Sequence, residues 1–152
     1  NGDKPIAKNI KATVKINYYK ELLDGFTYVD TTNYHIVWES ENLIDDDIEN
    51  ENQKTGKIFN ADNFNLSIYK HDLDDKFLIR TFEAGVGETL SCGSGSSATA
   101  FVIFNKYPSL DKIFLSSKGG EMICYKEDDN KICTEANTEI IYKSSFDERE
   151  YF

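Results

Sequence analysis

The stretch Glu83-Ala-Gly-Val-Gly-Glu-Thr-Leu-Ser-Cys-Gly-Ser-Gly-Ser-Ser-Ala98 holds four of the nine glycines of the chain. Glycine at this density indicates backbone that takes unusual dihedral angles or that lets another group approach closely. The segment 98–104 that follows is apolar on all sides, which predicts a buried helix, and the segment 77–82 before it predicts a strand. Cys92 therefore lies between a glycine loop and a buried helix. The expected N-cap of this helix is one of three serines: Ser94, Ser96 or Ser97.

Cys92 is predicted to be chemically active because of its place before the helix. A thiol beside a helix N-terminus lies at the positive end of the macrodipole, which favours the thiolate and lowers the pKa. The free N–H groups of the same terminus can bind a carboxylate or a phosphate. The alternative is that the glycine loop is only a turn and that the cysteine fills space. The physical chemistry of the stretch leaves both interpretations open.

Other glycine motifs fit this stretch less well. A phosphate-binding P-loop needs Lys-Ser or Lys-Thr after its last glycine, and no lysine lies between Lys76 and Lys106. Residues 93–98 fit the loose dinucleotide pattern G-x-G-x-x-A, but a second glycine loop separates them from the strand. No G-x-S-x-G nucleophile motif is present.

Composition limits the kind of protein. The 152 residues are 39% hydrophobic and 13% aromatic, which is enough for one domain with a core. The net charge of −10 argues against nucleic acid and anionic membranes as partners, and the absence of an apolar run of 18 residues argues against a membrane span. Three cysteines without C-x-x-C spacing argue against a disulfide framework or a structural zinc site and favour the cytoplasm. The segment 1–5 lacks Met and the apolar core of a signal peptide, so we expect a chain cut from a longer one.

Apolar alternation predicts further strands outside the glycine loop. The carboxylate-rich segment 39–52 predicts a short exposed helix with an acidic outer face. Leu43, Ile44 and Ile48 would form its apolar side, and Lys54-Thr-Gly-Lys57 would end it. The segment 59–69 is expected to be a loop that enters a strand. The other expected strands are 10–16, 26–29, 32–38 and four closing antiparallel strands at 112–116, 119–125, 131–134 and 139–142.

The order Glu83-x-Gly-x-Gly-Glu-Thr-x-x-Cys92-Gly-Ser-Gly resembles the C-terminal catalytic signature of the diaminopimelate epimerase family. The related proline racemases carry a similar Cys-Gly-Thr-Gly with a different lead-in. Thr32-Asn-Tyr-His-Ile-Val37 resembles the Gly-Asn-Pro-His-x-Val segment of the same family, with Thr32 and Tyr34 in place of the glycine and the proline. The resemblance covers residues 28–142 and is dense at the motif and thin elsewhere.

The resemblance implies a fold of two similar domains, each a β-sheet wrapped round a central helix, with the active site in the cleft between them. For this chain it implies one α+β domain over 1–152, with a mostly antiparallel sheet curled round one buried helix. This domain would be the C-terminal catalytic half, with the N-terminal half absent. In the family, one thiolate removes the substrate α-proton and a thiol of the other domain delivers one. Neither pyridoxal phosphate nor a metal takes part, so no cofactor is expected.

Each functional residue is carried over from the position of the family motif that it matches. Glu83 is expected to hold the substrate ammonium group and, with His35, to set the protonation state of Cys92. The N–H groups of Gly93 and Ser94 and the Ser94 hydroxyl are expected to bind the α-carboxylate. The predicted catalytic residues are thus Cys92, Glu83 and His35. The predicted substrate-binding residues are Asn33, Asn63, Gly93 and Ser94, with Asn65 as the alternative to Asn63.

Two departures from the family pattern affect the substrate and the chemistry. Ala84 stands where the family has an arginine that pairs with the distal carboxylate of diaminopimelate, which leaves the substrate open. A nearby cation, Arg80, lies earlier in the same strand. Cys124 and Cys133 lie in strand-like runs without an Asn-Gly-x-x-Cys context and are expected to fill space. The second thiol is therefore expected in the missing N-terminal domain.

The primary functional prediction is the C-terminal domain of a diaminopimelate epimerase, which converts LL- to meso-diaminopimelate for lysine and peptidoglycan synthesis and is inactive without its other domain. The expected partners are an amino-acid substrate with an α-carboxylate, the N-terminal domain and, in a homodimer, a second copy. The alternatives are a non-catalytic carboxylate-binding half-domain and a related isomerase or racemase that acts on another amino acid.

Overall fold

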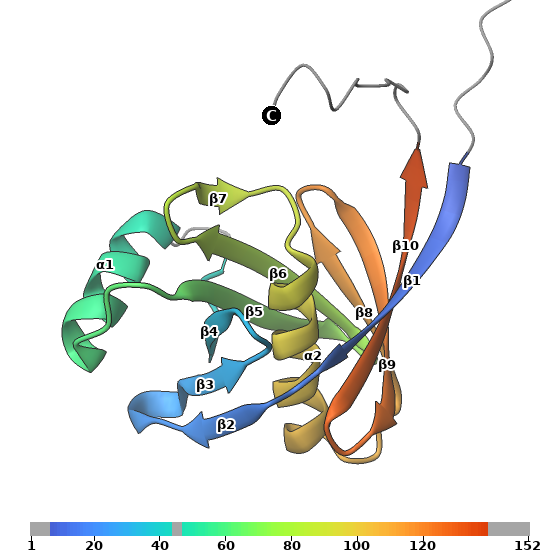
Figure 1. Cartoon of the computed structure of the whole chain (residues 1–152), viewed down its shortest axis with the longest axis horizontal. Coiled ribbons are helices and arrows are strands. Elements are labelled where there is room, and N and C mark those ends of the chain that lie inside the picture. The colour runs from blue at the N-terminus through green and yellow to red at the C-terminus, as the bar shows by residue number, and fades with distance from the viewer. Residues whose placement is uncertain (1–6, 44–46, 140–152) are drawn as a thin grey trace, which may run out of the picture.

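Helix α2 (Gly93–Lys106) stands inside a curled sheet, and helix α1 (Ile48–Phe59) packs on the outside of that sheet (Figure 1). The computed structural model describes residues 7–43 and 47–139. The sheet has ten strands in the order β1-β10-β9-β8-β6-β5-β4-β3-β2, with β7 paired to β6. The strands are β1 (Ala7–Lys15), β2 (Tyr18–Glu21), β3 (Thr27–Asp30), β4 (Tyr34–Glu39), β5 (Asn65–Leu73), β6 (Lys76–Glu83), β7 (Gly87–Thr89), β8 (Lys112–Ser117), β9 (Gly120–Asp128) and β10 (Lys131–Glu139).

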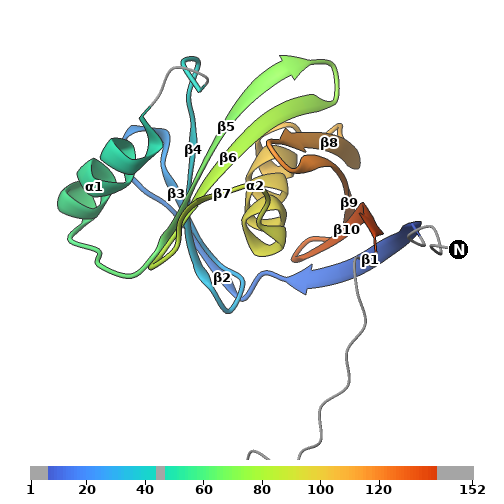
Figure 2. The ribbon, with the colours of Figure 1, turned by 90° about the horizontal axis from the view of Figure 1, so that it is seen from above.

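The two ends of the sheet meet at the link between β1 and β2. These strands are consecutive in the chain but lie at opposite ends of the strand order. The N–H of Ile16 donates to the carbonyl of Asn130 at 2.7 Å, beside the β1 end. The N–H of Asn17 donates to the carbonyl of Asp30 at 2.8 Å, beside the β2 end. The sheet therefore nearly closes round α2, as the view from above shows (Figure 2).

Helix α2 fills the inside of the sheet because its side chains are small or apolar on every side. Ala98, Ala100 and Ile103 have no exposed surface. The strand residues that pack against α2 in the same core are Val29, Val37, Tyr69, Phe77, Ile79, Ile113, Leu115, Cys124 and Ile132.

None of the helices in the described parts of the chain is long and apolar enough to cross a membrane.

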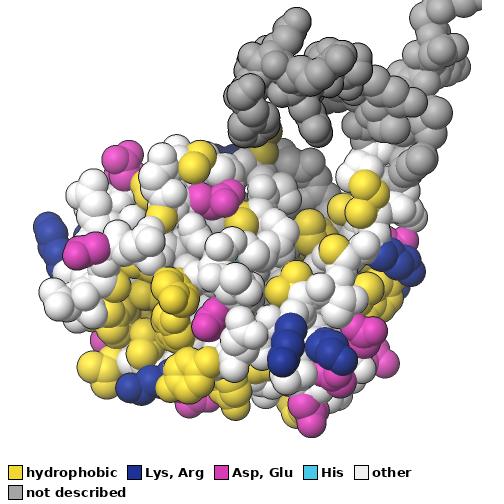
Figure 3. Space-filling view, in the orientation of Figure 1, with side chains coloured by type: hydrophobic (Ala, Val, Ile, Leu, Met, Phe, Trp, Pro, Cys, Tyr) yellow, Lys and Arg dark blue, Asp and Glu magenta, His cyan; other side chains and the backbone are white. Residues whose placement is uncertain are grey.

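Helix α1 covers the other face of β4, β5 and β6, where hydrophobic side chains gather beside it (Figure 3). Side chains alternate between the two faces of a strand, so Val37 of β4 faces α2 whereas Ile36 faces α1. The same alternation places Glu83 on the α2 side of β6 and Arg80 on the α1 side. The core residues on the α1 side are Phe26, Ile36, Leu43, Ile48, Phe64, Leu66 and Ile68.

The helix of the acidic segment begins further along the chain than the sequence predicts. Helix α1 begins only after Asp47, whose side chain accepts a hydrogen bond from the N–H of Asn50 at 3.2 Å and so caps the helix. The predicted stop at 54–57 is wrong, because α1 continues to Asn60, which ends it in the left-handed conformation. Ile44 lies outside the described residues.

The predicted fold is confirmed at the level of a mostly β, curled sheet with two helices, while several strands differ. The segments 131–134 and 139–142 are not two strands, since β10 runs unbroken to Glu139 and pairs with β1 along its whole length. Residues 140–142 lie outside the described part of the chain. Strands β2 and β7 were not predicted: the first is an exposed edge strand, and the second has three residues within the glycine loop.

Candidate functional site

Cys92 is the N-cap of α2 and ends the loop that follows the β6–β7 hairpin. Its Sγ accepts a hydrogen bond from the N–H of Gly95 at 3.4 Å. The predicted serine N-caps are therefore wrong. The serines lie inside the helix, where Ser97 Oγ, for example, donates to the carbonyl of Gly93 at 2.9 Å.

Gly95 lets the first turn of α2 come close to the sheet. A Cβ atom at this position would lie 3.0 Å from Ser67 Oγ of β5 and 3.1 Å from Thr81 Oγ1 of β6. It would also lie 3.3 Å from the sulfur of Cys92. Gly95 therefore lies close to the thiol and to both strand hydroxyls, and even a methyl group at this position would crowd all three.

Burial decides the protonation of Cys92, which is only 8% exposed. Burial raises the pKa of the thiol, and the charge and hydrogen bonding of Glu83 raise it further. Hydrogen bonds from Ser94 and from the N–H of Gly95 lower it, but they are outweighed. The expectation of a lowered pKa is thus wrong, because the helix N-terminus acts on a thiol that is shielded from water. Cys92 is a thiol at neutral pH.

His35 of β4 lies under the first turn of α2 with no exposed surface. Its Nε2 is 3.0 Å from Ser94 Oγ, and Ser94 Oγ is 3.5 Å from Cys92 Sγ. Burial lowers the pKa of the imidazole to about 4, against the opposing charge of Glu83. The imidazole is therefore neutral at neutral pH.

The surroundings of the His35 ring also determine which of its two nitrogen atoms carries the hydrogen. Nδ1 is buried and has no hydrogen-bond partner within the described residues. A neutral imidazole carries one N–H, and a buried N–H without an acceptor is costly, so we assign the hydrogen to Nε2. Nε2 then donates to Ser94 Oγ. Either atom of the contact between Ser94 Oγ and the sulfur could donate, and because this oxygen already accepts from Nε2, we assign the Ser94 hydroxyl as the donor.

Glu83 ends β6 on the same side of the sheet as Thr81 and Cys92. Its Oε1 accepts a hydrogen bond from Thr89 Oγ1 at 2.6 Å across the β6–β7 hairpin. Glu83 influences the pKa of both Cys92 and His35, so the structure brings the three predicted catalytic residues together. Thr89 has no predicted role, although the Gly-Glu-Thr part of the motif contains it.

Asn33 and Asn63 are exposed and line an open cavity of about 330 Å³ that also reaches Glu83. Asn33 comes from the β3–β4 turn, and Asn63 from the loop before β5. Glu83 therefore connects this cavity to the thiol. The residues that line the cavity are Thr32, Asn33, Tyr34, Asn63, Phe64, Asn65, Glu83 and Ala84.

Asn65 joins two edges of this cavity. Its Oδ1 accepts a hydrogen bond from the N–H of Ala84 at 3.0 Å, and its Nδ2 donates to the carbonyl of Tyr34 at 3.2 Å. Both polar atoms of the amide are thus engaged within the protein. Of the two asparagines that the sequence leaves open, Asn63 is the one that faces the cavity with an exposed side chain.

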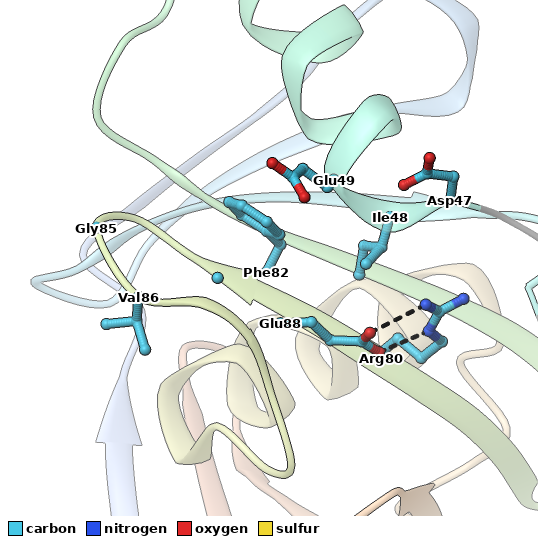
Figure 4. Close-up of a pocket in the computed structure, with 9 residues that line it drawn as sticks. Asp47, Ile48, Glu49, Arg80, Phe82, Gly85, Val86 and Glu88 are labelled. Carbon is cyan, nitrogen blue, oxygen red and sulfur yellow. Dashed lines mark hydrogen bonds and ion pairs between the residues drawn. The ribbon is translucent and has the colours of Figure 1, made fainter.

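Arg80 lies on the opposite face of β6, in a separate pocket of about 530 Å³ next to α1 (Figure 4). Its Nε and Nη2 donate to the two oxygens of Glu88 at 2.7 and 3.1 Å, and its Nη1 donates to the carbonyl of Leu43 at 2.8 Å. The guanidinium of Arg80, together with the ammonium group of Lys118, lowers the pKa of Glu88 to about 2. Arg80 therefore serves this pair and does not point toward the cavity of Asn33 and Asn63.

Within residues 7–43 and 47–139, no group of three or more His, Cys, Asp or Glu side chains is arranged to hold a metal ion.

No known family model matches this chain. A curated diaminopimelate epimerase of Flavobacterium psychrophilum is 28% identical over 133 residues, which cover 85% of this chain and 50% of that protein. One of Campylobacter lari is 26% identical over 141 residues, which cover 88% and 55%. The chain is related to diaminopimelate epimerases. It spans about half the length of these curated relatives.

Solved structures show the same fold at low identity. A phenazine biosynthesis protein of the PhzF family from Bacillus anthracis superposes with a TM-score of 0.61 at 14% identity, over 88% of this chain and 61% of that one. A putative PhzC/PhzF protein from Clostridium difficile gives 0.57 at 16% identity, over 96% and 59%. The relationship to diaminopimelate epimerases thus rests on the sequence, and these structures add the likeness in fold.

Proposed function

We propose that this chain is the C-terminal domain of a cofactor-independent, two-cysteine amino-acid epimerase, with Cys92 as one of its two acid/base groups. The observation that supports the proposal is the position of Cys92 at the N-cap of α2. Its sulfur receives the N–H of Gly95 and lies beside the Ser94 hydroxyl and the Glu83 carboxylate. The relationship to diaminopimelate epimerases makes the conversion of LL- to meso-diaminopimelate the first candidate reaction.

The proposed chemistry transfers one proton on each face of the α-carbon. Burial keeps Cys92 in the S–H form. In the reaction direction that starts from this form of the enzyme, Cys92 is therefore the acid. A thiolate outside this chain removes the α-proton, and the electron pair of the broken C–H bond moves toward the α-carboxylate. Cys92 then delivers its proton to the opposite face. No electron is gained or lost overall, and the two thiols exchange protonation states.

The substrate would bind across the cavity and the first turn of α2. The N–H groups of Gly93 and Ser94 face the α-carboxylate, where they stabilise the charge that develops there. Glu83 holds the ammonium group and, with His35, sets the protonation state of Cys92. Asn33 and Asn63 fix the remainder of the substrate.

A second candidate is an isomerase for an amino acid without a distal carboxylate. Ala84 carries no charge, and Arg80 points away from the cavity and is paired with Glu88. Among the described residues that line the cavity there is a carboxylate, Glu83, but no lysine or arginine. Such a lining suits an uncharged or ammonium-bearing substrate side chain better than a second carboxylate.

The test uses the natural protein that contains this chain. Its uptake of solvent deuterium at the α-carbon of LL-diaminopimelate, proline and hydroxyproline is followed by NMR, together with inversion. We expect Cys92→Ser to abolish uptake and inversion with the preferred amino acid, and Cys133→Ser to retain both. Uptake and inversion that persist in Cys92→Ser would refute the catalytic proposal. Binding of the amino acids without any uptake by the unaltered protein would support the non-catalytic alternative.

A further inference from the structure

The loop that carries Cys92 lies against the turn between β8 and β9, which Figure 1 shows beside it. The N–H of Gly119 in this turn donates to the carbonyl of Leu90 at 2.7 Å. Leu90 is 67% exposed, and Ser91 is exposed as well. The loop is therefore held through its backbone rather than through buried side chains.

Gly119 has a steric reason to be glycine. A Cβ atom there would lie 2.8 Å from the carbonyl oxygen of Leu90, 3.1 Å from its carbonyl carbon and 3.2 Å from Ser91 Cβ. Backbone atoms cannot rotate away as the end of a flexible side chain can, so a side chain at 119 must push the loop and the turn apart. The displaced residues of the loop would be those that immediately precede Cys92.

An ion pair joins the same turn to β7 as well. Lys118 Nζ lies 2.9 Å from Glu88 Oε1, and Glu88 is in turn held by Arg80. The β8–β9 turn thus contacts β7 at Glu88 and the loop at Leu90, four and two residues before Cys92. Two successive contacts of this kind restrain both the position and the direction of the segment that leads into α2.

We propose that the β8–β9 turn, through Gly119 and through Lys118, positions Cys92. Its close backbone contact with Leu90 holds the loop so that the thiol stays at the N-cap of α2, within reach of the N–H of Gly95. This role concerns the thiol itself and does not depend on which reaction the protein catalyses.

The test compares Gly119→Ala with Gly56→Ala in the natural protein. The control is matched, because a Cβ atom at Gly56 would lie 3.0 Å from the carbonyl oxygen of Ala61, on α1 and away from Cys92. Alkylation by iodoacetamide is measured between pH 6 and pH 10 by mass spectrometry of the peptide that contains Cys92. Loss of burial should raise the alkylation rate of Gly119→Ala at pH 7.5 by about fivefold and lower its pH midpoint, while Gly56→Ala stays within about twofold of the unaltered protein.

An unchanged rate and midpoint in folded Gly119→Ala would overturn the proposal, as would an equal change in Gly56→Ala. If circular dichroism shows that Gly119→Ala does not fold, Lys118→Met decides instead, because it removes the contact with Glu88 without adding a clash. A faster alkylation of Cys92 in Lys118→Met would then support the proposal, and an unchanged rate would overturn it.

Discussion

The Nε2 atom of His35 lies 3.0 Å from Ser94 Oγ, although 59 residues separate them in the chain. The contact joins β4 to the first turn of α2 directly beside Cys92. Because the Nδ1 atom of the buried ring has no partner in the described parts of the protein, we assign Nε2–H as the donor to Ser94 Oγ and the serine hydroxyl as the donor to the sulfur. With this assignment, a fully buried strand residue directs a hydrogen bond toward the thiol.

Ser94→Ala should raise the pKa of Cys92 further, because it removes a hydrogen bond that favours the thiolate. A single hydrogen bond of this kind contributes about 0.5 to 1.5 kcal/mol, so alkylation of Cys92 at pH 7.5 should slow by about two- to tenfold. The pH midpoint of Cys92 alkylation measures the pKa. Ser94→Thr keeps the hydroxyl and serves as the control, with a midpoint near that of the unaltered protein. A midpoint in Ser94→Ala that stays in place or falls would contradict the assigned direction of the hydrogen bond.

His35 should make the protein less stable in acid. The unfolded chain takes up a proton near the ordinary pKa of 6.5, whereas the folded protein resists until about pH 4. The contribution of neutral His35 to the unfolding free energy is therefore complete above pH 6.5, falls as the pH drops toward 4, and stays at its low value below pH 4. Such a shift corresponds to about 3 kcal/mol of unfolding free energy at most.

His35→Gln removes this titration and provides the measurement. Urea unfolding at pH 7.5 and pH 4.5 gives the difference in unfolding free energy between the unaltered protein and the variant at each pH. This difference should move by about 2 to 3 kcal/mol in favour of the variant at the lower pH. Carboxylates that titrate in both proteins cancel in the comparison. A difference that is the same at both pH values would show that His35 is not the group responsible.

Local sequence predicts the parts of this fold that depend on neighbours in the chain. The strand before the glycine loop and the apolar helix after it follow from the alternation and composition of 77–104. The start of α1 depends on one capping side chain, Asp47, which a pattern of apolar residues does not reveal. The length of β10 depends on its pairing with β1, more than 100 residues away, and is beyond any local pattern.

The site shows the same division. The order of the motif places Cys92 before the helix, and the structure keeps it there. The direction of its pKa shift could not be predicted from this placement, because it depends on how deeply the folded protein buries the thiol and on the nearness of Glu83. Both Asn63 and Asn65 line the cavity, and which of their amides is already engaged depends on the backbone of distant segments, since Ala84 and Tyr34 bind the Asn65 amide.

Thr32→Gly should stabilise the protein. Thr32 has a φ of 83°, a conformation that strains a β-branched residue and suits glycine. Relief of this strain, less the entropy that glycine adds to the unfolded chain, should increase the unfolding free energy by about 0.5 to 1 kcal/mol in urea. Thr31→Gly is the control and should destabilise, because Thr31 is buried and its hydroxyl donates to the carbonyl of Asn33. A loss of stability in Thr32→Gly equal to that of Thr31→Gly would mean that the strain is not relieved.

Gly95→Ala should destabilise the protein and disturb the thiol together. The new methyl group would lie 3.0 Å from Ser67 Oγ and 3.3 Å from Cys92 Sγ, so the first turn of α2 must move away from the sheet. Overpacking of this kind costs about 1 to 3 kcal/mol of unfolding free energy. Gly93→Ala is the matched control at the same helix end, because a Cβ atom there meets nothing within 4 Å. Urea unfolding and Cys92 alkylation should both change in Gly95→Ala, and Gly93→Ala should keep its stability. If Gly95→Ala is as stable as the unaltered protein, the close packing of α2 on β5 does not set the position of the thiol.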